Sequence, residues 1–135
     1  MPRLFRESPL SSIWEGSGNV QALDVLRAMI KSPDAIEAFF TEVSEASGSE
    51  PRLDSFAAAT RAELDDLDGI ETRARRIVER MALSLQGSLL VRFGDEAVAD
   101  AFCATRLAGD WGSAFGTLPT GTDFGQIIER HAPQV

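Results

Sequence analysis

The chain has 135 residues, of which 44% are hydrophobic and 25% charged, and this composition predicts one compact domain with one core. The formal net charge of -8 opposes binding to nucleic acid, because that affinity is built largely from Lys and Arg that displace counterions. A single cysteine excludes an intrachain disulfide, and no apolar run approaches the roughly 20 residues of a membrane helix, so we expect a cytoplasmic protein without membrane contact.

The first 19 residues are predicted to form extended chain and loop, because proline and glycine recur in them. A helix is expected from Val20 to near Lys31, with Ser17 or Asn19 as its cap. The prediction depends on apolar residues that recur at spacings of three and four. These residues are Val20, Leu23, Leu26 and Ile30.

Two further helices are predicted before the middle of the chain. Ser32 is a candidate cap and Pro33 suits the first helical position, so the second helix begins there and ends by Gly48. The third follows Pro51 with the same apolar period and stops at the turn Asp68-Gly69.

The longest periodic stretch runs from Ala74 to Phe93 and predicts a central fourth helix, closed by Gly94. Asp95 is a candidate cap for a fifth helix that leads to Gly109, where glycine allows a left-handed helix stop.

The last part of the chain is expected to be a glycine-rich loop over residues 110–121, followed by one short helix. Asp123 and Gln126 have the spacing of a capping box at its start. Because no stretch alternates with period two, we predict an all-α fold, a small antiparallel helical bundle.

A distinctive sequence lies in the first quarter of the chain. The run from Arg6 to Val20, which contains Trp-Glu-Gly-Ser-Gly-Asn and continues through Leu23-Asp24-Val25-Leu26-Arg27, resembles the signature before the last bundle helix of AidB-like acyl-CoA dehydrogenases. The block from Ile77 to Leu107 is similar to the extra helical domain that follows the dehydrogenase core in that branch. The resemblance implies a carboxy-terminal piece of such a protein, with residues 1–31 ending the dehydrogenase bundle and residues 32–135 forming the extra domain.

In this family the glutamate of the turn is the general base that removes the α-proton of the acyl-CoA thioester while hydride leaves the β-carbon for the flavin, and Glu15 holds that position. A carboxylate beside an apolar acyl chain has its pKa raised toward working pH, which suits a base. The start of the following helix offers amide donors to the pyrophosphate of FAD. By resemblance the residues that contact FAD are Trp14, Gly16, Ser17, Gly18, Asn19 and Gln21.

Without the resemblance, the same turn is an ordinary capped entry to a helix. An acyl-CoA dehydrogenase also needs domains that this sequence does not contain, so we expect the isolated chain to bind no FAD and to be inactive. The resemblance implies a homo-oligomer or a pairing with a dehydrogenase polypeptide that supplies the missing domains. The alternatives are a helical assembly module without catalysis and, ranked below it, a DNA-binding remnant of the alkylation response.

Arg73, Arg76 and Arg80 share one face of the predicted central helix and are the candidates for binding a phosphate backbone. Glu71 has the spacing to pair with Arg75, and the chain is acidic. We therefore expect a solvated face and no DNA binding.

The remaining candidates for chemistry are one cysteine and one histidine. Cys103 lies on a predicted apolar face and is expected to be a buried small hydrophobe. His131 has no second ligand type at metal spacing and is expected on the surface, so no metal site is predicted.

Overall fold

The computed structural model describes residues 2–10, 17–112, 114 and 116–132, and within them every regular element is helical, which confirms the all-α prediction. The helices are α1 (Pro2–Glu7), α3 (Ser17–Lys31), α4 (Pro33–Ser44), α5 (Pro51–Asp65), α6 (Ala74–Phe93), α7 (Glu96–Phe102) and α8 (Phe124–Arg130), with a 3-10 turn η1 (Ile70–Arg73) and a π-helical turn η2 (Cys103–Leu107). None of these helices is long and apolar enough to cross a membrane.

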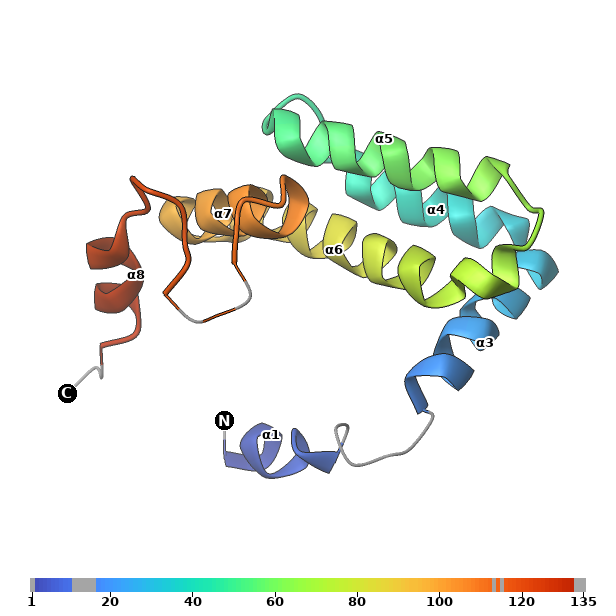
Figure 1. Ribbon diagram of the computed structural model, residues 1–135, viewed down its shortest axis with the longest axis horizontal. Helices are drawn as coiled ribbons and strands as arrows, with labels where there is room; N and C mark the ends of the chain where they lie inside the picture. Colours follow the sequence, from blue (N-terminus) through green and yellow to red (C-terminus); the bar gives the residue numbers. More distant parts are fainter. Residues whose placement is uncertain (1, 11–16, 113, 115, 133–135) are drawn as a thin grey trace.

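Helix α6 is the axis of the fold, and α4, α5 and α6 run in alternating directions (Figure 1). Local signals set where the first two of these helices begin. Pro33 and Pro51 occupy first-turn positions, where the missing amide hydrogen costs no hydrogen bond. The side chain of Glu50 caps α5 by accepting a hydrogen bond from the amide of Arg52 at 2.9 Å. Gly48, with φ +80°, allows the sharp turn between α4 and α5.

Helix α6 buries small residues where its neighbours cross it, so the backbones approach closely. Gly87 is an example, because a Cβ atom there would lie 3.0 Å from Leu53 Cδ1 and 3.1 Å from Leu107 Cδ1. Ser84 is also buried and returns its hydroxyl to the carbonyl of Arg80 at 2.8 Å. The absence of a side chain at Gly87 therefore lets α5 and η2 pack closely against α6.

Helix α3 packs against the first part of α6 through a separate small core. Ala22, Leu26 and Ala74 are buried at its centre. Leu23, Met29, Ile70 and Val78 cover its edge. We predicted a domain boundary after residue 31. Helix α3 lies before that boundary and contacts α6, which lies after it. The boundary itself stays a prediction.

The carboxy-terminal helices follow their predicted caps with one difference. Asp95 caps α7 by accepting from the amides of Ala97 and Val98 at 3.0 and 3.3 Å. Asp123 accepts from the amide of Gln126 at 2.9 Å, as half of a capping box. The second hydrogen bond of a capping box, from the Gln126 side chain back to Asp123, does not form. The Gln126 side chain instead bonds to Asp95, which links α8 to α7.

The amino-terminal segment also differs from the prediction of extended chain. Residues Pro2–Glu7 form helix α1, in which Arg3 and Glu7 pair at 2.9 Å across one turn. Helix α3 begins at Ser17, three residues before the predicted start at Val20. We predicted a loop because glycine and proline are frequent here. However, the first turn of a helix tolerates both residues, because its amide groups have no partner within the helix.

Candidate functional site

The predicted cofactor-binding turn is described only from its second half. Trp14, Glu15 and Gly16 lie outside the described residues. The other predicted residues occupy the first turns of α3, where Ser17 is half-buried and Gly18, Asn19 and Gln21 are exposed. The structure therefore brings these four residues together at one helix end.

Arg75, which the sequence did not single out for this site, lies beside this helix end. A Cβ atom at Gly18 would have Arg75 Nη2 as its nearest neighbour, at 4.0 Å. The packing of Ala22 and Leu26 on Ala74 holds the start of α3 against the first turn of α6. No sequence signal identified Arg75, because its position depends on how α3 crosses α6.

The guanidinium of Arg75 makes no hydrogen bond or ion pair with any described residue, and the expected pairing with Glu71 is not found. The amino end of a helix carries a partial positive charge and free amide donors. Two positive groups thus lie together without a carboxylate between them in the described part of the chain. Such a place suits an anion.

The other arginines at the start of α6 match the expected solvated face only in part, because the Arg76 side chain is 67% exposed whereas those of Arg73 and Arg80 are largely covered. Arg73 donates to the main-chain carbonyl of Asp66 at 2.6 Å, at the carboxyl end of α5. Arg76 Nη2 lies 3.0 Å from Glu63 Oε1, and Arg80 Nε lies 3.5 Å from the same oxygen. The expectation was wrong for Arg73 and Arg80, because α5 packs on this side of α6 and its carboxylates and carbonyls attract the guanidinium groups.

Burial confirms this structural role for two of these arginines. The Arg80 side chain is 19% exposed and its guanidinium lies 4.3 Å from the centre of the Phe56 ring, in a cation–π contact. The Arg73 side chain is 28% exposed. Neither is presented to solvent as a phosphate-binding residue would be.

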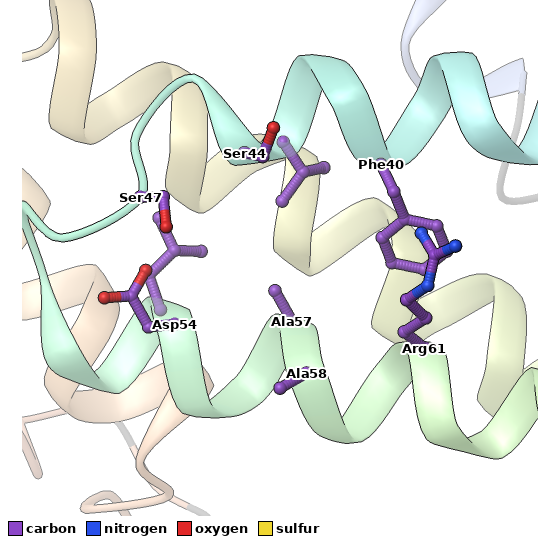
Figure 2. A pocket seen from close by; sticks show the side chains of 9 residues that line it. Phe40, Ser44, Ser47, Asp54, Ala57, Ala58 and Arg61 are labelled. Carbon is purple, nitrogen blue, oxygen red and sulfur yellow. The ribbon is translucent and has the colours of Figure 1, made fainter.

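A pocket of about 230 Å³ lies between α4 and α5 (Figure 2). Phe40, Ala57 and Ala58 line it, and Figure 2 shows the Arg61 side chain lying against the Phe40 ring, 5.0 Å from its centre. Arg61 pairs with Glu37 of α4 at 2.7 Å. The charge of Arg61 is already compensated within the protein. Ser44 and Asp54 also line the pocket, and they bond to the carbonyl of Thr41 at 2.7 Å and the amide of Gly48 at 3.1 Å.

A second ionic cluster joins the start of α5 to α7. Arg52 donates to Glu50 at 2.6 Å and to Asp100 at 2.7 Å. Hydrogen bonding from Arg52 holds the pKa of Glu50 below its usual value, and the two carboxylates raise the pKa of Arg52. The lowered pKa of Glu50 favours its charged form, which suits the ionic cluster between α5 and α7.

The cysteine and histidine have the expected positions. Cys103 is fully buried, and its burial, followed by the charge of Glu50, raises its pKa to about 11. A protonated, enclosed thiol is a poor nucleophile. His131 is exposed and its Nδ1 lies 2.8 Å from the carbonyl of Ile127. Within the described residues no cluster of His, Cys, Asp and Glu could hold a metal ion.

Comparison with known proteins shows that part of this chain is similar to part of a bacterial protein. The chain is 32% identical over 107 residues to the AidB protein of Escherichia coli (strain K12), whose name places it among the acyl-CoA dehydrogenases. The match covers 79% of this chain and 19% of the relative, so the chain spans about a fifth of that protein's length. No protein-family model matches the chain, and no solved structure matches it.

Proposed function

This chain is homologous to part of an AidB-type acyl-CoA dehydrogenase. We propose that it is a carboxy-terminal portion of an FAD-dependent enzyme that oxidises the bond between the α- and β-carbons of an acyl-CoA thioester to a double bond. The observation that carries this proposal is the identity of 32% over 79% of the chain. Because the chain spans 19% of the relative, the activity belongs to a larger assembly of which this chain is one piece.

In that assembly Glu15 is the base. Its carboxylate takes the α-proton, and the electron pair of that bond becomes part of the new double bond between the α- and β-carbons. FAD, when bound, supplies the acceptor for the hydride that leaves the β-carbon. Glu15 is suited to this step where an acyl chain displaces water, since an apolar neighbour raises a carboxyl pKa toward neutrality.

The described residues fit one part of FAD, the anionic pyrophosphate. The first turn of α3 offers amide donors from Gly18 and Asn19, and Arg75 adds a cation without a partner among the described residues. Gly18 has no side chain to obstruct that approach. Trp14, Gly16, Ser17 and Gln21 complete the proposed set by resemblance.

The proposed partner is a dehydrogenase polypeptide that supplies the missing domains, and the alternative is self-association of the chain as a homo-oligomer. Helix α3 has an apolar surface for such a partner, because Val20 is 57% exposed and Ile30 is 76% exposed. Large apolar side chains on one short helix are commonly covered in an assembly. An assembly role without catalysis would use the same surface.

Reconstitution separates the enzyme from the assembly module. The chain is purified alone and together with a dehydrogenase polypeptide lacking this region, and flavin absorbance and acyl-CoA oxidation are measured for each. We expect flavin and activity only in the complex, and activity reduced by at least roughly a hundredfold in Glu15→Gln with flavin content unchanged. A complex that forms but neither retains flavin nor oxidises acyl-CoA would favour the assembly module.

A further inference from the structure

Among the described residues, four arginines lie over aromatic rings, and one of these arginines differs from the rest. The guanidinium of Arg106 lies 5.1 Å from the centre of the Trp111 ring, and it makes no ion pair or hydrogen bond with a described residue. Each of the other three pairs with a carboxylate, namely Arg61 with Glu37, Arg80 with Glu63 and Arg92 with Glu42. Of the four, Arg106 alone keeps its charge available to a group from outside.

The ring beside this cation is also available. Trp111 is 54% exposed, although tryptophan is highly buried on average in folded proteins. Its indole N–H donates no hydrogen bond to a described residue. An exposed indole of this kind presents an apolar ring face together with one polar donor.

Arg106 and Trp111 line one pocket of about 610 Å³, in which Leu118 supplies further apolar surface. Pockets for small molecules are commonly about 300–1,000 Å³ and mostly apolar, with few polar groups. Thr117 also lines this pocket, but its hydroxyl is used within the loop. It accepts from the amide of Gly112 at 3.1 Å and donates to a main-chain carbonyl of the loop at 2.8 Å. The polar side-chain groups that the described lining leaves free are therefore all donors.

The backbone that carries Arg106 is anchored in the core. Arg106 belongs to the π-helical turn η2, which buries Cys103 and Thr105 and leaves Arg106 exposed. Gly109, with φ +80°, follows this turn, and the amide of Asp110 bonds back to a carbonyl within the turn at 3.0 Å. π-Helical turns occur frequently at functional sites. The turn thus fixes the backbone of the cation at the pocket, which lowers the entropy cost of binding.

The free groups define which ligand fits this pocket. Donors without a side-chain acceptor favour an anion, and a wall of indole and leucine favours a planar ring. One uncompensated cation balances one negative charge. Asp110 is exposed next to Trp111 in the sequence without an ion pair to a described residue, and the chain carries a net charge of -8, so a polyanion is disfavoured. We propose that this pocket binds a small aromatic carboxylate, with its ring against Trp111 and its carboxylate on the guanidinium of Arg106.

This pocket is separate from the proposed FAD site. Figure 1 shows the loop after η2 at the end of α6 where α7 lies, whereas α3 lies at the other end of α6. Binding of an aromatic carboxylate therefore needs neither FAD nor a dehydrogenase partner. A test on the chain alone is independent of the proposed dehydrogenase function.

Titration of the unchanged chain with naphthalene-2-carboxylate, followed by NMR, tests this site. The indole N–H signal of Trp111 reports on the pocket, and its absence from the spectrum of Trp111→Phe distinguishes it from the signal of Trp14. We expect the Trp111 signal to move and to saturate with a Kd on the order of 1 mM, which suits a probe of this size. The corresponding alcohol, which lacks the charge, should bind about tenfold more weakly. The saturated decahydronaphthalene carboxylate, which lacks the aromatic rings, should bind roughly threefold more weakly.

Arg106→Gln should bind naphthalene-2-carboxylate about tenfold more weakly and leave binding of the alcohol unchanged, because it removes the charge and keeps the apolar wall. Arg92→Gln is the matched control, since Arg92 also lies over a ring, 4.6 Å from the centre of Phe93, but pairs with Glu42. This control should bind the carboxylate like the unchanged chain. The dispersion of the amide signals checks that each variant is folded.

Three outcomes would overturn the proposal. The first is a Trp111 signal that does not move with up to roughly 10 mM naphthalene-2-carboxylate. The second is an alcohol or a saturated carboxylate that binds as tightly as the aromatic carboxylate. The third is equal affinity of Arg106→Gln and Arg92→Gln for the aromatic carboxylate.

Discussion

The side-chain amide of Gln126 donates a hydrogen bond to Asp95 Oδ2 at 2.9 Å, across 31 positions of sequence. The other oxygen of the same carboxylate caps α7 through the amides of Ala97 and Val98. One aspartate thus ends the loop after α6, begins α7 and holds α8. The Asp95 carboxylate is therefore a polar link between α7 and α8.

Gln126→Ala should therefore weaken the attachment of α8 to α7 without unfolding the other helices. The remaining amide of residue 126 still bonds to Asp123, so the helix keeps its own cap. Hydrogen exchange at the amides of Ile127 and Ile128 should quicken, while exchange in α6 stays unchanged. Gln21→Ala, an exposed glutamine on α3, is the control and should leave α8 exchange unaltered.

The same contact predicts a pH dependence. The hydrogen bond from Gln126, followed by those from Val98 and Ala97, holds the pKa of Asp95 below its ordinary value. The stabilisation is thus present above the ordinary pKa of about 3.9 and is lost as pH falls through the lowered value. Amide exchange in α8 should quicken in acid, and Asp95→Asn should reduce that dependence on pH after correction for intrinsic rates, while the Asp123 cap remains in both proteins.

Gly87→Ala should destabilise the fold by about 1 kcal/mol. The added methyl group meets Leu53 and Leu107 at 3.0 and 3.1 Å, and overpacking of this kind costs about 1–3 kcal/mol, partly offset by the better helix propensity of alanine, about 1 kcal/mol. Urea unfolding measures the change. Gly18→Ala is the matched control, since its nearest neighbour is 4.0 Å away, and it should not destabilise.

Arg75→Ala should weaken FAD retention in the reconstituted complex, because it removes the cation beside the start of α3. We expect a loss of about tenfold in FAD affinity, the effect of one charge-assisted contact, measured by flavin fluorescence during dialysis. Arg27→Ala, an exposed arginine of the same region that pairs with Asp24, should leave affinity unchanged. Equal retention in the two variants would remove Arg75 from the proposed site.

Cys103 should resist thiol reagents in the folded chain at pH 8, since its pKa is raised to about 11 and the side chain is fully buried. The unfolded thiol ionises at a lower pH, so the stability that the buried neutral thiol contributes is complete below about pH 8.5 and is lost as pH rises toward 11. The rate of reaction with a disulfide reagent, measured with and without urea, compares the accessibility of the Cys103 thiol in the unfolded and the folded chain. Rapid labelling without urea would contradict the burial.

The sequence by itself determined the helical class and the order of the helices from residue 17 onward. Apolar residues at spacings of three and four define a buried stripe whatever the stripe contacts, and Pro33, Pro51, Asp95 and Asp123 act on backbone groups within a few residues. The homology to an acyl-CoA dehydrogenase was also readable from the first quarter of the chain, and the comparison confirmed it. The roles of Glu15 and of the FAD-contacting residues stay predictions.

Only the tertiary structure decided which partner each polar side chain meets. Arg73, Arg76 and Arg80 were assigned to solvent because their partners on α5 lie 10 to 24 residues away in sequence. Arg75 acquires its place beside Gly18 in the same way. Such contacts depend on the crossing of two helices, and that crossing is set by small buried residues such as Ala74 and Gly87, whose spacing gives no local signal of which helix will cover them.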